Sequence, residues 1–342
     1  MRRAAAALAV LLALALAGAG CVPRTVDYEQ ISPKERLVAR FSHVTAENSP
    51  KHLAAVRFAE AARERAGGRV EIQVYPNSQL YRDWEEIRAV QEGAIQFIAV
   101  APSKLVEFDA AWQVYDMPYL FTSFADVERL FNSDLGLQMR KRLEEKGLVA
   151  LAIWPNGFKQ FTNRLRPQVA PSDFQGLVFR AQAGQVLQDQ FAAVGARAVV
   201  SSFNTLYADI ETGRIDGQEN TPNNIYTRNL PSVQPFLTIS DHGFLAYVVI
   251  TRAAWWKGID PALKEPLVAG LDEASRWVRE NAPAMNEEAL AKLTASDRVQ
   301  VYTLSQLERE ALRAAFAPVY QGLESRLGRG FLAQVLSSMG RE

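Results

Sequence analysis

The chain has 342 residues, of which 48% are hydrophobic and 22% are charged, a composition typical of ordinary globular proteins. Its 38 lysines and arginines balance 38 aspartates and glutamates, so the net charge is zero. Nucleic acids and anionic membrane surfaces attract proteins with a basic excess, so neither is an expected partner. Any anion that the chain binds must therefore meet a local site.

Residues 1–21 have the pattern of a targeting segment and are not expected to take part in the fold. Arg2 and Arg3 precede an apolar run over residues 4–17, which is too short to span a bilayer comfortably. Small residues follow up to Cys21. The pattern predicts export, with the periplasm as the location of the mature protein.

Cys21 is the only cysteine in the sequence, so the chain cannot form an intrachain disulfide. It stands where a bacterial lipoprotein carries its acylated cysteine, and the pattern predicts a lipid anchor there. Gly18 replaces the leucine-like residue usual three positions earlier, so cleavage before Gly20 by an ordinary signal peptidase stays open as the alternative. Residues 22–36 show no periodicity and are expected to form a tether.

From Leu37 onward, strand and helix patterns alternate. Apolar or alternating runs predict strands over residues 37–44, 70–75, 95–102, 148–154, 160–163, 177–180 and 196–200. Helical spacing of apolar residues predicts helices over 51–66, 83–93, 184–194 and 203–212. This order is the signature of an open α/β sheet with parallel strands.

The C-terminal third continues with two strands and long helices. Strands are predicted over 236–240 and 244–250, and a long helix over 260–290. Ser305 and Glu308 form a capping-box pattern that opens a further helix, which Pro318 should kink.

The mature chain is larger than the size at which one hydrophobic core keeps growing, so two lobes are expected. Lobe I is placed at 37–156 plus 246–285, and lobe II at 157–245 plus 286–342. Two α/β lobes with a ligand between the carboxyl ends of their strands fit a periplasmic binding protein.

Long ordered motifs support this interpretation: FSHVTAENSPKH, GGRVEIQVYPNSQLYRDWEEI, DMPYLF, WPNGFKQFTN, GLVFRAQAGQVLQDQF and DIETGRIDGQENTPNNIY. They resemble the solute-binding proteins of tripartite ATP-independent periplasmic (TRAP) transporters, and most closely the branch that binds C4-dicarboxylates. The resemblance implies a type II-like, two-lobe periplasmic binding protein fold with a long helix spanning both lobes. It also implies that the chain binds malate, succinate, fumarate or a similar organic acid and delivers it to TRAP permease subunits.

Arg180 follows a short apolar run, 177–179, that predicts a buried strand. Its guanidinium presents a planar fork that matches a carboxylate and cannot lose its proton. The resemblance implies that Arg180 is the arginine that clamps the substrate carboxylate. Asn220 follows a predicted turn at 216–217 and matches an asparagine that bonds the same carboxylate, although it can also serve as a turn residue that caps the next segment.

Lys159 matches a lysine or arginine that the family directs into the cleft. A dicarboxylate needs a second cation, because a buried carboxylate without a partner is heavily penalised. We therefore predict that Lys159 binds the far carboxylate. Further candidates on the same wall are Trp154, Phe158 and Asn163, with packing as the expected role of the aromatic residues, while Gln218 and Glu219 are expected to support the site.

The first lobe is expected to contribute polar side chains to the site. The candidates are His43, Asn48, Gln79, Glu85 and Ser103. His43 can equally be a buried core histidine with satisfied hydrogen bonds.

The sequence predicts neither an enzyme nor a metal or cofactor site. No cysteine or histidine stands beside a general base near Arg180 to activate a nucleophile. The histidines His43, His52 and His242 show no metal-ligand spacing, and His242 is expected to be structural.

Two departures from the family pattern leave the exact ligand open. Thr205 stands where the family has a glutamate, and Arg252 stands where an asparagine is common. Arg252 either adds a cation near the cleft or points to solvent. The alternatives are therefore a monocarboxylate, a keto acid or an aromatic acid, or presentation of the ligand to a sensor kinase without transport.

Overall fold

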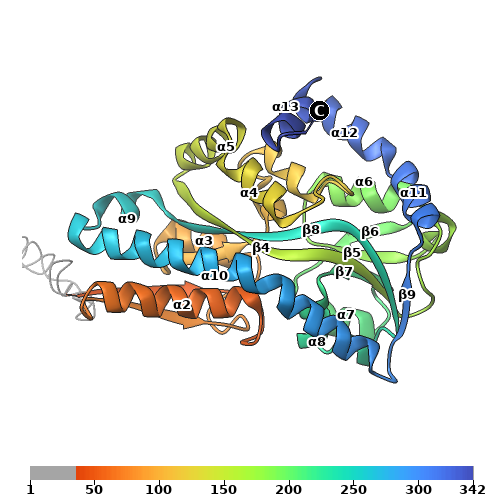
Figure 1. Cartoon of the computed structure of the whole chain (residues 1–342), viewed down its shortest axis with the longest axis horizontal. Helices are drawn as coiled ribbons and strands as arrows, with labels where there is room; N and C mark the ends of the chain where they lie inside the picture. Colours follow the sequence, from red (N-terminus) through yellow and green to blue (C-terminus); the bar gives the residue numbers. More distant parts are fainter. Residues whose placement is uncertain (1–35, 342) are drawn as a thin grey trace, which may run out of the picture.

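The computed structural model describes residues 36–341 (Figure 1). The predicted targeting segment with Cys21, and the predicted tether up to residue 35, lie outside these residues. Within the described range, no helix combines the length and the apolar composition that crossing a bilayer requires.

A single sheet of nine strands forms the centre of the described part of the chain, in the order β2-β1-β3-β8-β4-β7-β5-β6 with β9 paired to β8. The strands are β1 Leu37–Ser42, β2 Val70–Tyr75, β3 Phe97–Val100, β4 Leu148–Asn163, β5 Val178–Ala181, β6 Arg197–Val200, β7 Gly217–Asn220, β8 Phe236–Arg252 and β9 Gln300–Thr303. β1 pairs in parallel with β2 and β3 at one end, and β5 pairs in parallel with β6 and β7 at the other. The predicted α/β class with parallel strands is confirmed at both ends of the sheet.

The centre of the sheet differs from the prediction of separate short strands. The runs 148–154 and 160–163 belong to one strand, β4, and the runs 236–240 and 244–250 belong to one strand, β8. The two pair antiparallel along most of their length, with register shifts that include one between Pro155 and Gly157. Such an irregularity lets a strand tolerate proline and glycine, which in the sequence look like strand breakers.

β7 was predicted only as a turn and its following residues. The structure pairs it antiparallel with β4, placing Asn220 opposite Gln160. Gly217 is required there, because a Cβ atom would lie 2.4 Å from the Phe179 ring. This four-residue strand has little hydrophobic signature of its own, so its pairing depends on neighbours far away in the sequence.

The helices agree well with the predicted ones where both exist. They are α2 Pro50–Arg65, α3 Glu85–Glu92, α4 Phe124–Asn132, α5 Asp134–Glu145, α6 Gln185–Ala193, α7 Leu206–Glu211, α8 Pro222–Thr227, α9 Ala253–Gly258, α10 Pro261–Thr294, α11 Gln306–Ala315, α12 Ala317–Leu327 and α13 Phe331–Ser338, with 3₁₀ turns η2 Pro102–Leu105, η3 Ala110–Asp116, η4 Pro171–Phe174 and η5 Leu230–Ser232. The capping box at Ser305 and Glu308 is confirmed. The predicted kink at Pro318 is wrong, because the region forms two helices, α11 and α12. Pro318 lies in the first turn of α12, where the backbone N–H that proline lacks has no partner within the helix.

Figure 1 shows the long helix α10 lying along α2 and continuing to α8 at the other end of the molecule. Its inner face buries apolar residues such as Leu263, Leu267 and Val278 against α2 and the first strands. Ser49 caps α2 by accepting a hydrogen bond from the His52 N–H at 3.2 Å. This cap fixes the start of α2 and places the next residues, beginning with Pro50, over the carboxyl ends of the strands.

The C-terminal helices α12 and α13 cover elements from both predicted lobes. Apolar residues of α12, including Val319 and Leu323, are buried in one core cluster with residues of α5 and α6. α13 packs against α4 and α5. The predicted lobe boundaries stay a prediction, and α13, which we assigned to lobe II, contacts helices that we assigned to lobe I.

Candidate ligand-binding site

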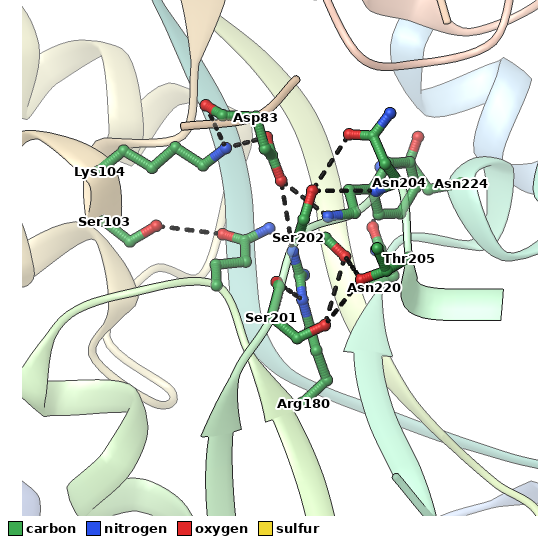
Figure 2. Close-up of polar contacts among 12 residues, drawn as sticks. Asp83, Ser103, Lys104, Arg180, Ser201, Ser202, Asn204, Thr205, Asn220 and Asn224 are labelled. Atoms are coloured by element: carbon green, nitrogen blue, oxygen red, sulfur yellow. Dashed lines mark hydrogen bonds and ion pairs between the residues drawn. The ribbon is translucent and has the colours of Figure 1, made fainter. Parts of the chain in front are cut away.

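A polar cavity lies between the first and second halves of the chain. The polar residues that line it are Thr45, Lys51, Asp83, Glu86 and Lys104 from the first half, and Arg180, Gln182, Asn220, Asn224 and Tyr247 from the second. Figure 2 shows side chains of both halves pointing toward one another around Arg180. The site therefore forms where the two halves meet.

Arg180 rises from β5 into the cavity and is only 2% exposed. Its Nε donates to the Ser201 carbonyl at 2.9 Å, and its Nη2 lies 3.8 Å from the Asp83 carboxylate. Its Nη1 is buried and makes no hydrogen bond with any described residue. A buried charged donor without a partner is costly, so this nitrogen is suited to an incoming anion.

Asn220, at the end of β7, provides a second such donor. Its side-chain oxygen accepts hydrogen bonds from the Thr221 N–H at 3.1 Å and from the Asn224 amide at 2.8 Å. These bonds orient the amide and leave Nδ2 buried without a partner among the described residues. Arg180 and Asn220, the two strongest candidates from the sequence, thus line the same cavity, each with an unpaired donor.

The first half of the chain supplies two further cations, Lys51 and Lys104. Lys51, in the first turn of α2, donates to the Ala99 carbonyl at 3.1 Å, and its Nζ lies 3.9 Å from the centre of the Tyr247 ring. Burial lowers the pKa of Lys51 to about 8. Lys104, in η2, contacts the carboxylate of Asp83.

Two carboxyl groups of the cavity, Asp83 and Glu86, are held in different protonation states. Burial by itself would raise the pKa of Asp83, but Lys104, Arg180 and the Phe203 N–H together lower it to about 2. Burial raises the pKa of Glu86 to about 8, because Lys51 and Lys104 only partly oppose it. At neutral pH Asp83 is therefore ionised and Glu86 is mostly neutral.

Asp83 also connects the two halves of the chain. Its Oδ2 accepts a hydrogen bond from the Phe203 N–H at 2.8 Å, and Phe203 lies 120 positions further along the chain. Ser103 makes a similar connection, because its hydroxyl donates to the Gln182 side chain at 3.2 Å. Ser103 itself is not part of the cavity lining, although Gln182 is.

Lys159 does not line the cavity, contrary to the expected arrangement. Its ammonium contacts Glu219 and lies 3.9 Å from Asp116, and its side chain is 1% exposed. The second oxygen of Glu219 is bonded to His242 at 2.7 Å and to Gln190 at 2.7 Å. The charge of Lys159 is thus balanced inside the protein, and the second cations of the cavity are Lys51 and Lys104 instead.

The Lys159 cluster keeps its own carboxylate ionised. Burial alone would raise the pKa of Glu219, but Lys159 and His242 lower it well below its usual range. Burial lowers the pKa of His242, which also stacks on Phe161 with ring centres 3.6 Å apart. His242 is a buried member of this network, in agreement with its expected structural role.

Among the remaining first-lobe candidates, His43 lies behind the cavity wall and the others lie on the surface. The His43 ring is within hydrogen-bonding distance of Thr45, which lines the cavity, and of His52. Four of the predicted site residues are exposed and do not line the cavity: Asn48, Gln79, Glu85 and Arg252. Arg252 thus takes the solvent-facing alternative.

The other predicted wall residues have packing roles. Trp154 stacks on Phe41 at 5.8 Å and donates to Ser275, so it belongs to the core. Phe158 packs edge-to-face on Phe244 and lines a separate surface depression. Asn163 accepts from the Leu165 and Arg166 N–H groups, and so shapes the turn after β4.

Residues 41–326 match the model of the family described as bacterial extracellular solute-binding protein, family 7. The chain belongs to this family. Its members are solute-binding proteins of transporters and not enzymes, in agreement with the sequence prediction.

Relatives of this solute-binding protein are similar along nearly their whole length. The C4-dicarboxylate-binding protein DctB of Bacillus subtilis is 38% identical over 310 residues, which cover 91% of this chain and 89% of the relative. The C4-dicarboxylate-binding periplasmic protein DctP of Rhodobacter capsulatus is 34% identical over 302 residues, which cover 88% of this chain and 90% of the relative.

A solved structure confirms the predicted two-lobe fold. The crystal structure of a TRAP periplasmic solute-binding protein from Shewanella oneidensis, with bound succinate, superposes with a TM-score of 0.85 at 34% identity. The superposition covers 89% of this chain and 99% of that one. The predicted resemblance of the chain to TRAP solute-binding proteins is therefore confirmed.

Several residues that line the cavity of this solute-binding protein were not predicted from the sequence: Lys51, Asp83, Glu86, Lys104 and Tyr247. A signal for Lys51 was present, because Ser49 and Pro50 mark the start of a helix that follows the first strand. Lys104 likewise follows the third strand after a short turn. Residues at the carboxyl ends of strands are the expected ligand contacts of an open α/β sheet.

Proposed function

We propose that this chain is the extracytoplasmic subunit of a TRAP transporter, and that it binds a C4-dicarboxylate such as succinate, malate or fumarate and delivers it to a membrane permease. The observation that carries the proposal is a pair of buried donors, Arg180 Nη1 and Asn220 Nδ2, that have no hydrogen-bond partner within residues 36–341. They lie in a cavity that Lys51 and Lys104 also line. The ligands named for the relatives and bound in the similar crystal structure support the same class of acid.

In this proposal the two carboxylates of the ligand have different partners. The fork of Arg180 and the amide of Asn220 bind one carboxylate, because both present N–H donors to the same space. Lys51 and Lys104 neutralise the other, which loses its water when the site closes. Lys159 supports this wall from behind, since its partner Glu219 precedes Asn220 on β7.

The energetics require all of these groups together. One charge-assisted hydrogen bond contributes about 1.5 to 3 kcal/mol net, whereas micromolar affinity corresponds to about 8 kcal/mol. No single contact suffices, so ligand binding must engage both halves of the chain at once. This requirement favours closure of the two lobes around the ligand.

A thermal-shift screen against small organic acids tests the proposal. A ligand at a hundred times its dissociation constant stabilises the folded state by about 2.7 kcal/mol, which is easily detected. We expect succinate, malate and fumarate to raise the melting temperature, and butyrate of similar length to have a smaller effect. Stabilisation by monocarboxylates alone would contradict the dicarboxylate assignment.

We also infer that the mature protein is held at the membrane through Cys21. The support is the position of this cysteine, which follows a short apolar segment and three small residues, 18–20. Mass spectrometry of the protein purified from its membrane fraction should find a lipid-modified N-terminal cysteine. A mature chain that begins at Gly20 with a free thiol would show ordinary secretion instead.

A further inference from the structure

Glu86 is a buried carboxyl group in the wall of the ligand cavity. It lies in the first turn of α3 and is only 1% exposed. The Ser42 hydroxyl, from β1, donates to its Oε1 at 2.9 Å. The sequence motifs did not indicate a role for this carboxyl group. The proposed binding of an anion does not explain it either, because an ionised carboxylate at this position would repel the ligand.

Charged groups from three other parts of the chain surround Glu86. Lys51 on α2 and Lys104 on η2 favour its ionised form, whereas Asp83, just before α3, favours its neutral form. The charged residues that line the cavity are Lys51, Asp83, Glu86, Lys104 and Arg180. Asp83 is held ionised by its contacts with Lys104, Arg180 and the Phe203 N–H.

The charge balance of the cavity depends on Glu86 once a ligand is present. Three cations, Lys51, Lys104 and Arg180, line the cavity. A bound dicarboxylate and Asp83 bring three negative charges, which match these cations only when Glu86 is neutral. With a monocarboxylate, the charges match when Glu86 is ionised. A buried site with unmatched charge is strongly disfavoured, so the charge of the ligand and the protonation of Glu86 are linked.

We propose that Glu86 enters the complex with a C4-dicarboxylate as a neutral carboxylic acid and donates a hydrogen bond to the ligand, so that the site holds one proton together with the dianion. This inference rests on the proposed function. It makes Glu86 a specificity-determining residue, because its proton adapts the cavity to a doubly charged ligand. The free energy that holds this proton comes from burial and from the ligand charge.

The sign of the pH dependence follows from the two states of Glu86. Burial raises its pKa to about 8 in the protein, and a nearby dianion raises it further. As the pH rises above about 8, free protein loses this proton and must regain it on binding, so the apparent affinity for a dianion falls. Lys51, whose pKa is also about 8, changes the affinity in the same direction, so a pH profile of binding alone does not identify the group.

Carbon-13 NMR of the glutamate carboxyl groups observes the proton directly. The signal that disappears in Glu86→Gln is assigned to Glu86, and Glu86→Asp gives the same assignment if the amide variant does not fold. With saturating succinate, we expect this signal to stay at the position of a protonated acid from about pH 6 to pH 9. Without ligand it should move to the ionised position as the pH rises through about 8, and with butyrate this move should come at a lower pH than with succinate.

Binding measurements complete the test. Glu86→Gln should bind succinate within about threefold of the natural protein near pH 7, because the amide also donates a hydrogen bond and carries no charge. Glu92→Gln is the matched control, since Glu92 is exposed at the other end of α3, and its affinity should be unchanged.

Three results would overturn the inference: a Glu86 signal at the ionised position in the succinate complex at about pH 7, identical signals with succinate and butyrate at every pH, or a loss of more than about tenfold in Glu86→Gln. If no C4-dicarboxylate binds the natural protein at all, the proposed function fails, and this inference fails with it. Binding without the bound proton would leave the proposed function standing and remove only the role of Glu86.

Discussion

Arg180 and Lys51 present positive charge in different ways, and this difference determines what each recognises. The guanidinium of Arg180 is a planar fork whose Nε is already fixed by Ser201, so its remaining donors have a set direction. The ammonium of Lys51 is a point charge at the end of a flexible chain. A carboxylate bound by Arg180 is therefore oriented, whereas one bound by Lys51 is mainly neutralised.

Replacement of Arg180 by lysine tests whether the fork matters. Both Arg180→Lys and Arg180→Ala should weaken succinate binding by about 2 to 5 kcal/mol, the usual cost of removing one partner of a buried charge pair. Isothermal titration calorimetry measures the loss, and circular dichroism confirms that the variants fold. Near-native affinity in Arg180→Lys would mean that charge alone suffices and that no bidentate clamp exists.

The contrasting positions of Lys51 and Lys159 predict opposite phenotypes for the same substitution. Lys51→Met should lower affinity for succinate much more than for butyrate, because it removes the partner of the far carboxylate. Lys159→Met should instead lower the free energy of unfolding by about 3 to 5 kcal/mol, because it leaves Glu219 buried without its main cation. Calorimetry with both acids and urea denaturation separate the two effects. If Lys159→Met lost succinate affinity selectively and kept its stability, the result would support the sequence-based prediction that Lys159 binds the far carboxylate.

At the scale of single elements, α2 and α10 decide where Lys51 points. α10 packs along α2, and Gly270 of α10 lies against the backbone of α2. A Cβ atom at Gly270 would lie 2.8 Å from the backbone nitrogen of Ala62 and 3.2 Å from its Cα. Backbone atoms cannot move aside as a flexible side chain can, so the two helices pack closely only because residue 270 lacks a side chain.

Gly270→Ala should therefore destabilise the protein although alanine favours helices. We expect a loss of about 1 to 3 kcal/mol from overpacking, measured by urea denaturation. Gly322→Ala, in the interior of α12, is the matched control, since its nearest neighbours are side-chain atoms at 3.4 Å. The control should be neutral or up to about 1 kcal/mol more stable. Equal effects in the two variants would show that the α2 and α10 contact is not tight.

At the scale of the whole molecule, the two halves are joined in two ways. The strands β4 and β8 run through the centre of the sheet and connect its two parallel ends, and α10 reaches from α2 to α8 (Figure 1). Around the cavity, by contrast, the halves meet through side-chain contacts such as Asp83 with Phe203 and Ser103 with Gln182. Contacts of this second kind can separate without unfolding either half, so opening is expected at the cavity.

A ligand that contacts both halves should favour the arrangement in which they are close. Small-angle X-ray scattering should therefore show a smaller radius of gyration after addition of saturating succinate. Arg180→Ala at the same succinate concentration serves as the control and should show little change. An unchanged radius in the natural protein at saturation would indicate a preformed pocket without hinge closure.

Local sequence patterns predicted the strands β2 and β6 and the helices α2, α3, α6, α7, α10 and α11. They did not predict α4, α5, α8, α9, α13 or β9. Ser49 and Pro50 begin α2, Gly93 ends α3 with a φ of 84°, and the capping box at Ser305 opens α11, because caps and glycine stops act within a few residues. The continuity of β4 through its bulges and the strand nature of β7 were not predictable in this way. Their hydrogen bonds come from strands distant in the sequence, and their own residues include breakers or polar side chains.

The sequence by itself determined the α/β class, the solute-binding family and the choice of Arg180 and Asn220, which both line the cavity, because ordered motifs and strand ends are visible along one chain. Only the tertiary structure decided which lysines line the cavity. Lys159 is paired with Glu219, while Lys51 and Lys104 line the cavity with Arg180. The physical reason is that a charge acts through distance in space and through burial, and both depend on which segments the sheet and α10 bring together.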